Sequence, residues 1–133
     1  MPVDPARLRP VPLFEGIHDA DVTMIAEHME ERLVSPGEHL TREGASGYFF
    51  FVILDGTASV ERQGELLATL GPGDFFGEAA VLEATRRNAT VTATSDMTAA
   101  ALFGADFAQY EHDSPELHAR IKRVMADRRI VDA

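Results

Sequence analysis

The sequence has no cysteine among its 133 residues, which excludes disulfide bonds, thiolate catalysis and cysteine-ligated metal sites. It also has no apolar run of about 18 residues, the length that a membrane-spanning helix needs. Basic residues are scarce, because 12 Lys and Arg stand against 22 Asp and Glu, for a net charge of -10. Since nucleic-acid-binding proteins carry basic faces, this balance argues against a nucleic-acid partner.

The start of the chain lacks the apolar stretch of a secretory signal peptide. Residues 1–10 contain three prolines and the charged residues Asp4, Arg7 and Arg9. Together with the absence of cysteine, this predicts a cytoplasmic protein. The length and the 45% hydrophobic content predict a single domain, 1–133, with an apolar core.

Helical patterns lie at both ends of the chain. We expect a loosely docked arm at residues 1–12 and a helical part at residues 13–32. Its main helix is predicted to begin at Asp19 or Asp21 and to end near Arg32. Its apolar face is formed by residues at helical spacing: Val22, Ile25, Ala26 and Met29.

C-terminal helices are predicted for residues 104–133. A short helix is expected at residues 106–112. A longer one begins at Ser114, where a serine cap, a proline in the first position and an acidic first turn follow one another.

Between these helices, residues 33–103 alternate short apolar runs with turn signals. Residues 48–54 are apolar on both faces, as in a strand covered on both sides. Asp55-Gly56 is a hairpin signal and predicts that residues 57–62 pair with that strand. Residues 89–94 alternate apolar and polar side chains, which is typical of a half-buried strand. These short, evenly spaced strands predict a mainly β protein, a jelly roll or barrel with flanking helices.

Residues 70–93 contain the most informative stretch. After a turn at residues 71–74, Gly77 opens a short helical turn whose free N–H groups would favour an anion. Arg86 and Arg87 follow, and an arginine can hold a phosphate through two parallel hydrogen bonds. Glu78 would repel a phosphate, so we assign it hydrogen bonds from sugar hydroxyls. A phosphate with a ribose indicates a nucleotide.

Two segments of this stretch, 76–82 (FGEAAVL) and 87–91 (RNATV), resemble the phosphate-binding cassette of cyclic-nucleotide-binding domains. That family includes the catabolite activator protein and the regulatory subunits of cyclic-AMP-dependent protein kinase. Residues 43–56 (EGASGYFFFVILDG) resemble a turn and strand of the same family. The resemblance implies an eight-stranded jelly roll, or β-roll, with an N-terminal helix, C-terminal lid helices and a cassette at residues 76–91.

The resemblance also implies roles for single residues. Arg87 would bind the phosphate and Glu78 the ribose, while Arg86 stays solvated. The other expected ligand contacts are Phe76, Gly77, Ala79, Ala80, Asn88, Ala89, Leu70 and Val60. For Val60 and Leu70, as for Phe75, plain core packing is an equal alternative. A purine cap is expected from the last helix, with Arg120, Ile121 and Arg123 as candidates; packing or self-association of that helix is the alternative.

The expected ligand is cyclic AMP ahead of cyclic GMP, although Asn88 differs from the residues usual at this point in the family. The expected function is a regulatory sensor in which ligand binding moves the C-terminal helix. Transcription factors of the family carry a DNA-binding unit after this helix and none follows in this sequence, so we expect either a stand-alone sensor or one domain of a longer protein.

No enzyme or metal site is predicted. The histidines at positions 18, 28, 39, 112 and 118 show no metal-pair spacing within one strand or helix, and no nucleophile, base and orienting group stand out. Two alternatives stay open. One is a degenerate, ligand-free roll that acts as an interaction or dimerisation module. The other is a small cupin-type enzyme that would bind metal through His39.

Overall fold

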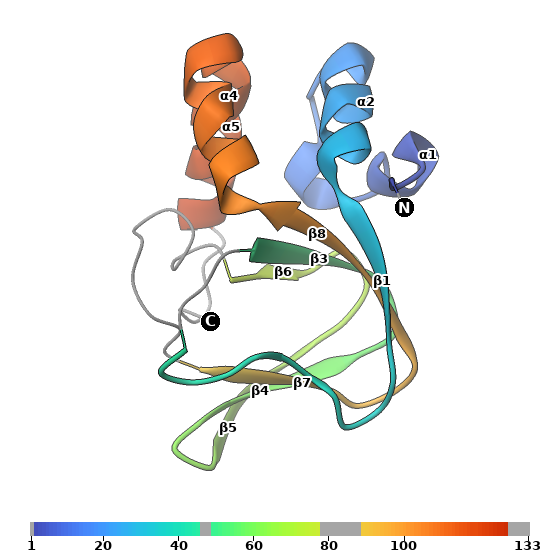
Figure 1. Cartoon of the computed structure of the whole chain (residues 1–133), viewed down its shortest axis with the longest axis vertical. Coiled ribbons are helices and arrows are strands. Elements are labelled where there is room, and N and C mark those ends of the chain that lie inside the picture. The colour runs from blue at the N-terminus through green and yellow to red at the C-terminus, as the bar shows by residue number, and fades with distance from the viewer. Residues whose placement is uncertain (1, 46–48, 78–88, 128–133) are drawn as a thin grey trace.

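Three layers make up the protein in a computed structural model that describes residues 2–45, 49–77 and 89–127. Helices cover one face of a four-stranded antiparallel sheet, and a second four-stranded sheet lies across its other face (Figure 1). The eight strands in two sheets confirm the β-roll that the sequence predicted.

The first sheet, called here the helix-covered sheet, has the order β1-β8-β3-β6. Its strands are β1 (Glu30–Val34), β8 (Met97–Phe103), β3 (Phe49–Asp55) and β6 (Phe75–Phe76). The second, called the outer sheet, has the order β2-β7-β4-β5. Its strands are β2 (His39–Thr41), β7 (Thr90–Ala93), β4 (Ala58–Arg62) and β5 (Glu65–Leu70).

Strand β3 faces both cores, as its unbroken apolar run predicted. Because side chains alternate along a strand, Phe50 and Val52 point to the helices while Phe51 and Ile53 point to the outer sheet. We call the first apolar cluster the helical core and the second the roll interior. The roll interior consists of Phe51, Ile53, Ala58, Val60, Leu70, Phe76, Ala89, Val91, Ala93, Met97, Ala99 and Ala101.

The hairpin predicted at Asp55-Gly56 is wrong, because β3 and β4 belong to different sheets. Strand β3 pairs with β8 and β6, whereas β4 pairs with β5 and β7. Gly56, at a φ of 90°, is the corner at which the chain passes from one sheet to the other. A β-carbon on Gly56 would lie 2.4 Å from the carbonyl oxygen of Asp96, so only glycine fits this crossing.

The helices are α1 (Pro5–Leu8), the 3-10 turn η1 (Pro12–Phe14), α2 (Asp19–His28), α4 (Gly104–Asp113) and α5 (Pro115–Asp127). The apolar face predicted for α2 is buried. The predicted end near Arg32 is wrong, since Met29 is already extended and residues 30–34 pair with β8. The β1 ladder satisfies the backbone groups of these residues, which overrides the helical preference of Glu30 and Glu31.

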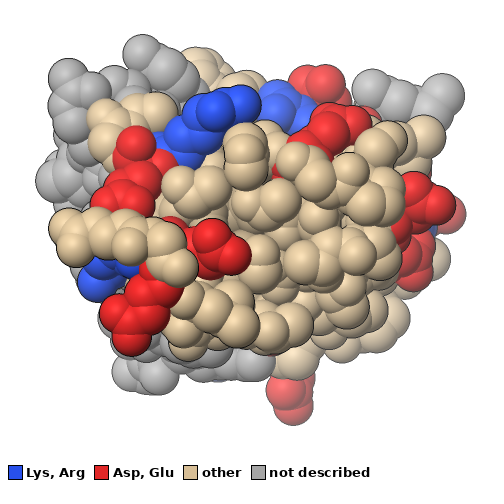
Figure 2. Space-filling view, turned by 90° about the horizontal axis from the view of Figure 1, so that it is seen from below, with Lys and Arg blue, Asp and Glu red and all other residues tan. Residues whose placement is uncertain are grey.

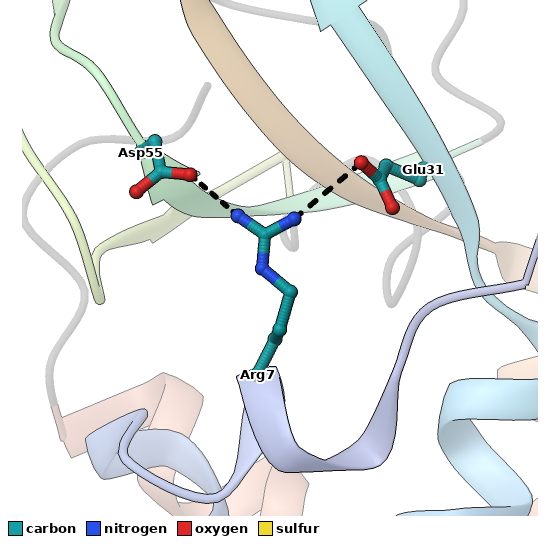
Figure 3. A network of polar contacts seen from close by, with 3 residues as sticks. All are labelled: Arg7, Glu31 and Asp55. Atoms are coloured by element: carbon teal, nitrogen blue, oxygen red, sulfur yellow. Dashed lines mark hydrogen bonds and ion pairs between the residues drawn. The ribbon is translucent and has the colours of Figure 1, made fainter.

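The N-terminal arm is not loosely docked, which corrects the expectation for residues 1–12. Val3, Leu8 and Val11 are buried in the helical core. Arg7 reaches from α1 to the helix-covered sheet and bridges two carboxylates, Asp55 at 2.5 Å and Glu31 at 3.4 Å (Figure 3). The arm therefore forms part of the helical layer.

A polar contact between two stacked aromatic side chains joins helices α2 and α4. The hydroxyl of Tyr110 and Nδ1 of His28 lie 2.7 Å apart, and the two rings stack. Burial, and then the carboxylate of Asp106, raise the pKa of Tyr110 far above its ordinary value. The hydroxyl therefore keeps its proton and holds α4, which the sequence predicted at residues 106–112, against α2.

The crossing at Gly56 yields a stability prediction with a matched control. Gly56→Ala and Gly64→Ala both place alanine at positive φ, at a shared cost of about 1–2 kcal/mol. Only at Gly56 does the new β-carbon meet backbone, so we expect a further loss of about 1–3 kcal/mol in the free energy of unfolding. Denaturant unfolding of both variants measures the difference, and equal losses would contradict the close crossing.

Candidate functional site

Four of the residues predicted to contact a ligand lie together in the roll interior. Val60 on β4, Leu70 at the end of β5, Phe76 on β6 and Ala89 just before β7 are all buried in the same apolar cluster. They come from both sheets and surround the two ends of the predicted cassette. Phe75 points the other way and packs against the helical core, so it is not a wall of this site.

The structure describes the two ends of the predicted cassette, residues 76–77 and 89–91. At its start, the ring of Phe76 stacks on Phe51 with centroids 5.1 Å apart. Gly77 follows, buried and at a φ of 87° that favours glycine. The cassette residues Glu78, Ala79, Ala80, Arg87 and Asn88, together with Arg86, lie outside the described residues.

At the other end of the cassette, Thr41 holds the chain. Its hydroxyl donates a hydrogen bond to the carbonyl of Ala89 and accepts one from the N–H of Val91, both at 3.1 Å. Thr41 is only 5% exposed. Sequence reasoning missed this residue, because a threonine in a short strand carries no signal of a partner 48 residues away.

Arg32 brings a positive charge to the rim of the roll interior. Its guanidinium carbon lies 4.5 Å from the centroid of the Phe49 ring and 5.6 Å from that of Phe51. Such contacts between a cation and an aromatic face are attractive. The sequence did not single out Arg32, because its segment was predicted to be helical.

Two of the three candidates for a purine cap have other contacts in this arrangement. Arg120 donates a hydrogen bond from Nη2 to the carbonyl of Glu15 at 2.5 Å, next to Gly16. Ile121 is fully buried in the helical core, and Arg123 is exposed. Contact between Arg120 and a ligand would therefore require release of its bond to Glu15.

The charge of the described surface is mainly acidic. Seen from the side of the outer sheet (Figure 2), the surface is mostly uncharged, with more acidic than basic side chains around its rim. The side chains of β7 that face outward are threonines, and His39 Nδ1 lies 2.7 Å from the hydroxyl of Thr92. In the part of the chain that the structure describes, no three acidic or histidine side chains gather as a metal site would need. Among the same residues, no helix combines the length and the apolar character of a membrane span.

Comparison with known proteins gives a family match over most of the roll. The family model described as "Cyclic nucleotide-binding domain" matches residues 31–112. A cyclic nucleotide-gated potassium channel of Rhizobium etli is 32% identical over 119 residues, which cover 90% of this chain and 33% of the channel. A cAMP-dependent protein kinase regulatory subunit of Yarrowia lipolytica is 35% identical over 97 residues, 71% of this chain and 26% of that protein.

The fold has a close counterpart among solved structures. The catabolite activator protein of Thermus thermophilus superposes with a TM-score of 0.79 at 28% identity, over 88% of this chain and 57% of that one. The chain thus spans about a third of the channel and about a quarter of the kinase subunit.

The role of Thr41 can be tested by removing its hydroxyl. Thr41→Val keeps the shape but leaves two buried backbone groups without this partner, so the free energy of unfolding should fall by about 1–3 kcal/mol. Thr92→Val on the neighbouring strand breaks only the exposed contact to His39 and should change it by less than about 0.5 kcal/mol. Equal effects of the two substitutions in denaturant unfolding would show that Thr41 does not hold the cassette end.

Proposed function

Because the chain belongs to the cyclic nucleotide-binding domain family, we propose that it binds a cyclic nucleotide in the roll interior, with cyclic AMP preferred over cyclic GMP. We propose further that it acts as a regulatory sensor and not as an enzyme. The ligand would shift the position of α5 and so report its presence.

The arrangement of the cassette ends supports this proposal most directly. Phe76 and Ala89 are both buried in the roll interior, beside Val60 and Leu70. A ligand gripped by the residues between Phe76 and Ala89 would therefore lie against apolar walls from both sheets. Sites for small ligands are lined mainly by apolar side chains with a few polar groups, and this lining would match that pattern.

Within this site, each cassette residue has a proposed role. Arg87 binds the cyclic phosphate through two parallel charged hydrogen bonds. Glu78 accepts a hydrogen bond from the ribose 2′-hydroxyl. The small residues Gly77, Ala79 and Ala80 allow backbone N–H groups to approach the phosphate oxygens, as at the start of a helix. Asn88 can donate to or accept from the ligand.

Movement of α5 is the proposed output. In the described arrangement α5 is held by the bond from Arg120 to Glu15 and by the burial of Leu117 and Ile121. A ligand can change this arrangement only if it binds the two positions of the helix with different affinity. A purine cap by Arg120, Ile121 or Arg123 in the second position would supply that difference.

Arg87→Ala tests the phosphate site. Removal of one partner of a buried charged pair costs about 3–5 kcal/mol. The affinity for cyclic AMP should therefore fall by more than ~100-fold, as measured by calorimetric titration with cyclic AMP and cyclic GMP. Arg86→Ala is the matched control and should leave the affinity nearly unchanged. A wild-type chain that binds neither nucleotide would overturn the sensor and leave the ligand-free interaction module.

Glu78→Ala tests the ribose contact. A hydrogen bond to a charged group contributes about 1.5–3 kcal/mol, so the loss should be smaller than that in Arg87→Ala. Wild type should prefer cyclic AMP over its 2′-deoxy form, and Glu78→Ala should bind both alike. If the variant keeps the preference of the wild type, Glu78 does not contact the 2′-hydroxyl.

A further inference from the structure

The helical layer leaves one end of the helix-covered sheet open. Near this end, Arg7 contacts the sheet between Glu31 of β1 and Asp55 of β3 (Figure 3). Two residues beyond Glu31, Leu33 lies on the same face of β1. Its side chain is 80% exposed, the highest value among the exposed large hydrophobic residues of the described structure.

The strand register shows what lies beside Leu33. Leu33 pairs with Thr98 of β8, and Thr98 pairs in turn with Asp55 of β3. These three residues form a row across three strands, which Arg7 reaches at Asp55 while it also contacts Glu31 in the next row. The row is part of a hollow of about 400 Å³ whose wall includes Val34, Met97 and Asp96.

The charges around this hollow are acidic. Asp96 is exposed and makes no ion pair with any described residue. The side chain of Asp55 stays 68% exposed even though Arg7 contacts it. The same helix α1 that supplies Arg7 also buries Leu8 completely in the helical core. In α1, an arginine that pairs with Asp55 is thus followed by an apolar side chain that packs in the helical core.

We propose that this hollow is a docking site for a segment of a partner protein that carries basic side chains next to apolar ones. The apolar side chain would cover Leu33, and the basic one would pair with Asp96 and the exposed part of Asp55. Charge complementarity supports this occupant, because acidic side chains beside an exposed apolar one attract cationic segments and repel anionic ones. The partner would extend the helical layer over the end of the sheet. This proposal does not depend on nucleotide binding.

The test uses the full, isotope-labelled chain without nucleotide and a short capped peptide of alternating leucine and arginine. Amide shifts in nuclear magnetic resonance titration should concentrate at residues 33–35 and 96–98. A second peptide with glutamate in place of arginine should cause none there. Shifts spread over other surfaces, or equal binding of the two peptides, would overturn the proposal.

Matched variants distinguish peptide binding at this site from nonspecific binding elsewhere on the surface. Leu33→Lys should weaken peptide binding at least about tenfold, whereas Leu66→Lys, at the 60% exposed leucine of β5, should leave it unchanged. Asp96→Lys provides a second substitution at an exposed residue and should also weaken binding. Equal affinities of the Leu33 and Leu66 variants would refute the site. A wild-type dimer that Leu33→Lys dissociates in sedimentation would show that a second copy covers the hollow, which would also refute it.

Discussion

The double coverage of one sheet is the constraint on which this structure depends. Strand β3 sends alternate side chains, such as Val52 and Ile53, into two different apolar cores. One core holds the helices, α5 included, and the other surrounds the ends of the cassette. Among the described residues, the strands of this sheet lie between the two cores. Because packed cores resist small deformations, such a sheet can link the two sides without a direct contact between them.

Four arginines of this acidic protein link separate segments of the chain. Arg7 joins α1 to the helix-covered sheet, and Arg9 joins the arm to Asp19 at the start of α2. Arg32 lies over the ring of Phe49, and Arg120 joins α5 to the carbonyl of Glu15. Arg87 is the basic residue that the proposed function assigns to the phosphate of the ligand. An acidic chain can bind an anion only through such a local positive site.

The two candidate sites differ in place and in chemistry. The roll interior lies between the sheets and is proposed to hold an anion. The hollow beside Leu33 lies at one end of the helix-covered sheet, and its lining includes the acidic residues Asp55 and Asp96. The register assigns each residue to its face, since Leu33 pairs with Thr98 while the neighbouring Val34 pairs with Met97 of the roll interior. A shift of one residue would exchange the two faces.

Local signals in the sequence determined the elements whose cause is local. The apolar run of β3 and the start of α5 after Ser114 could both be predicted from neighbouring residues. The cassette was also recognisable from its motif, though the structure describes only its two ends. Tertiary structure alone decided the pairing of β1 with β8, the crossing at Gly56, and the contacts of Arg7 and Thr41. These features depend on partners far apart in the sequence, such as Arg7 and Asp55, which are separated by 48 positions. No short window of sequence contains both members of such a pair.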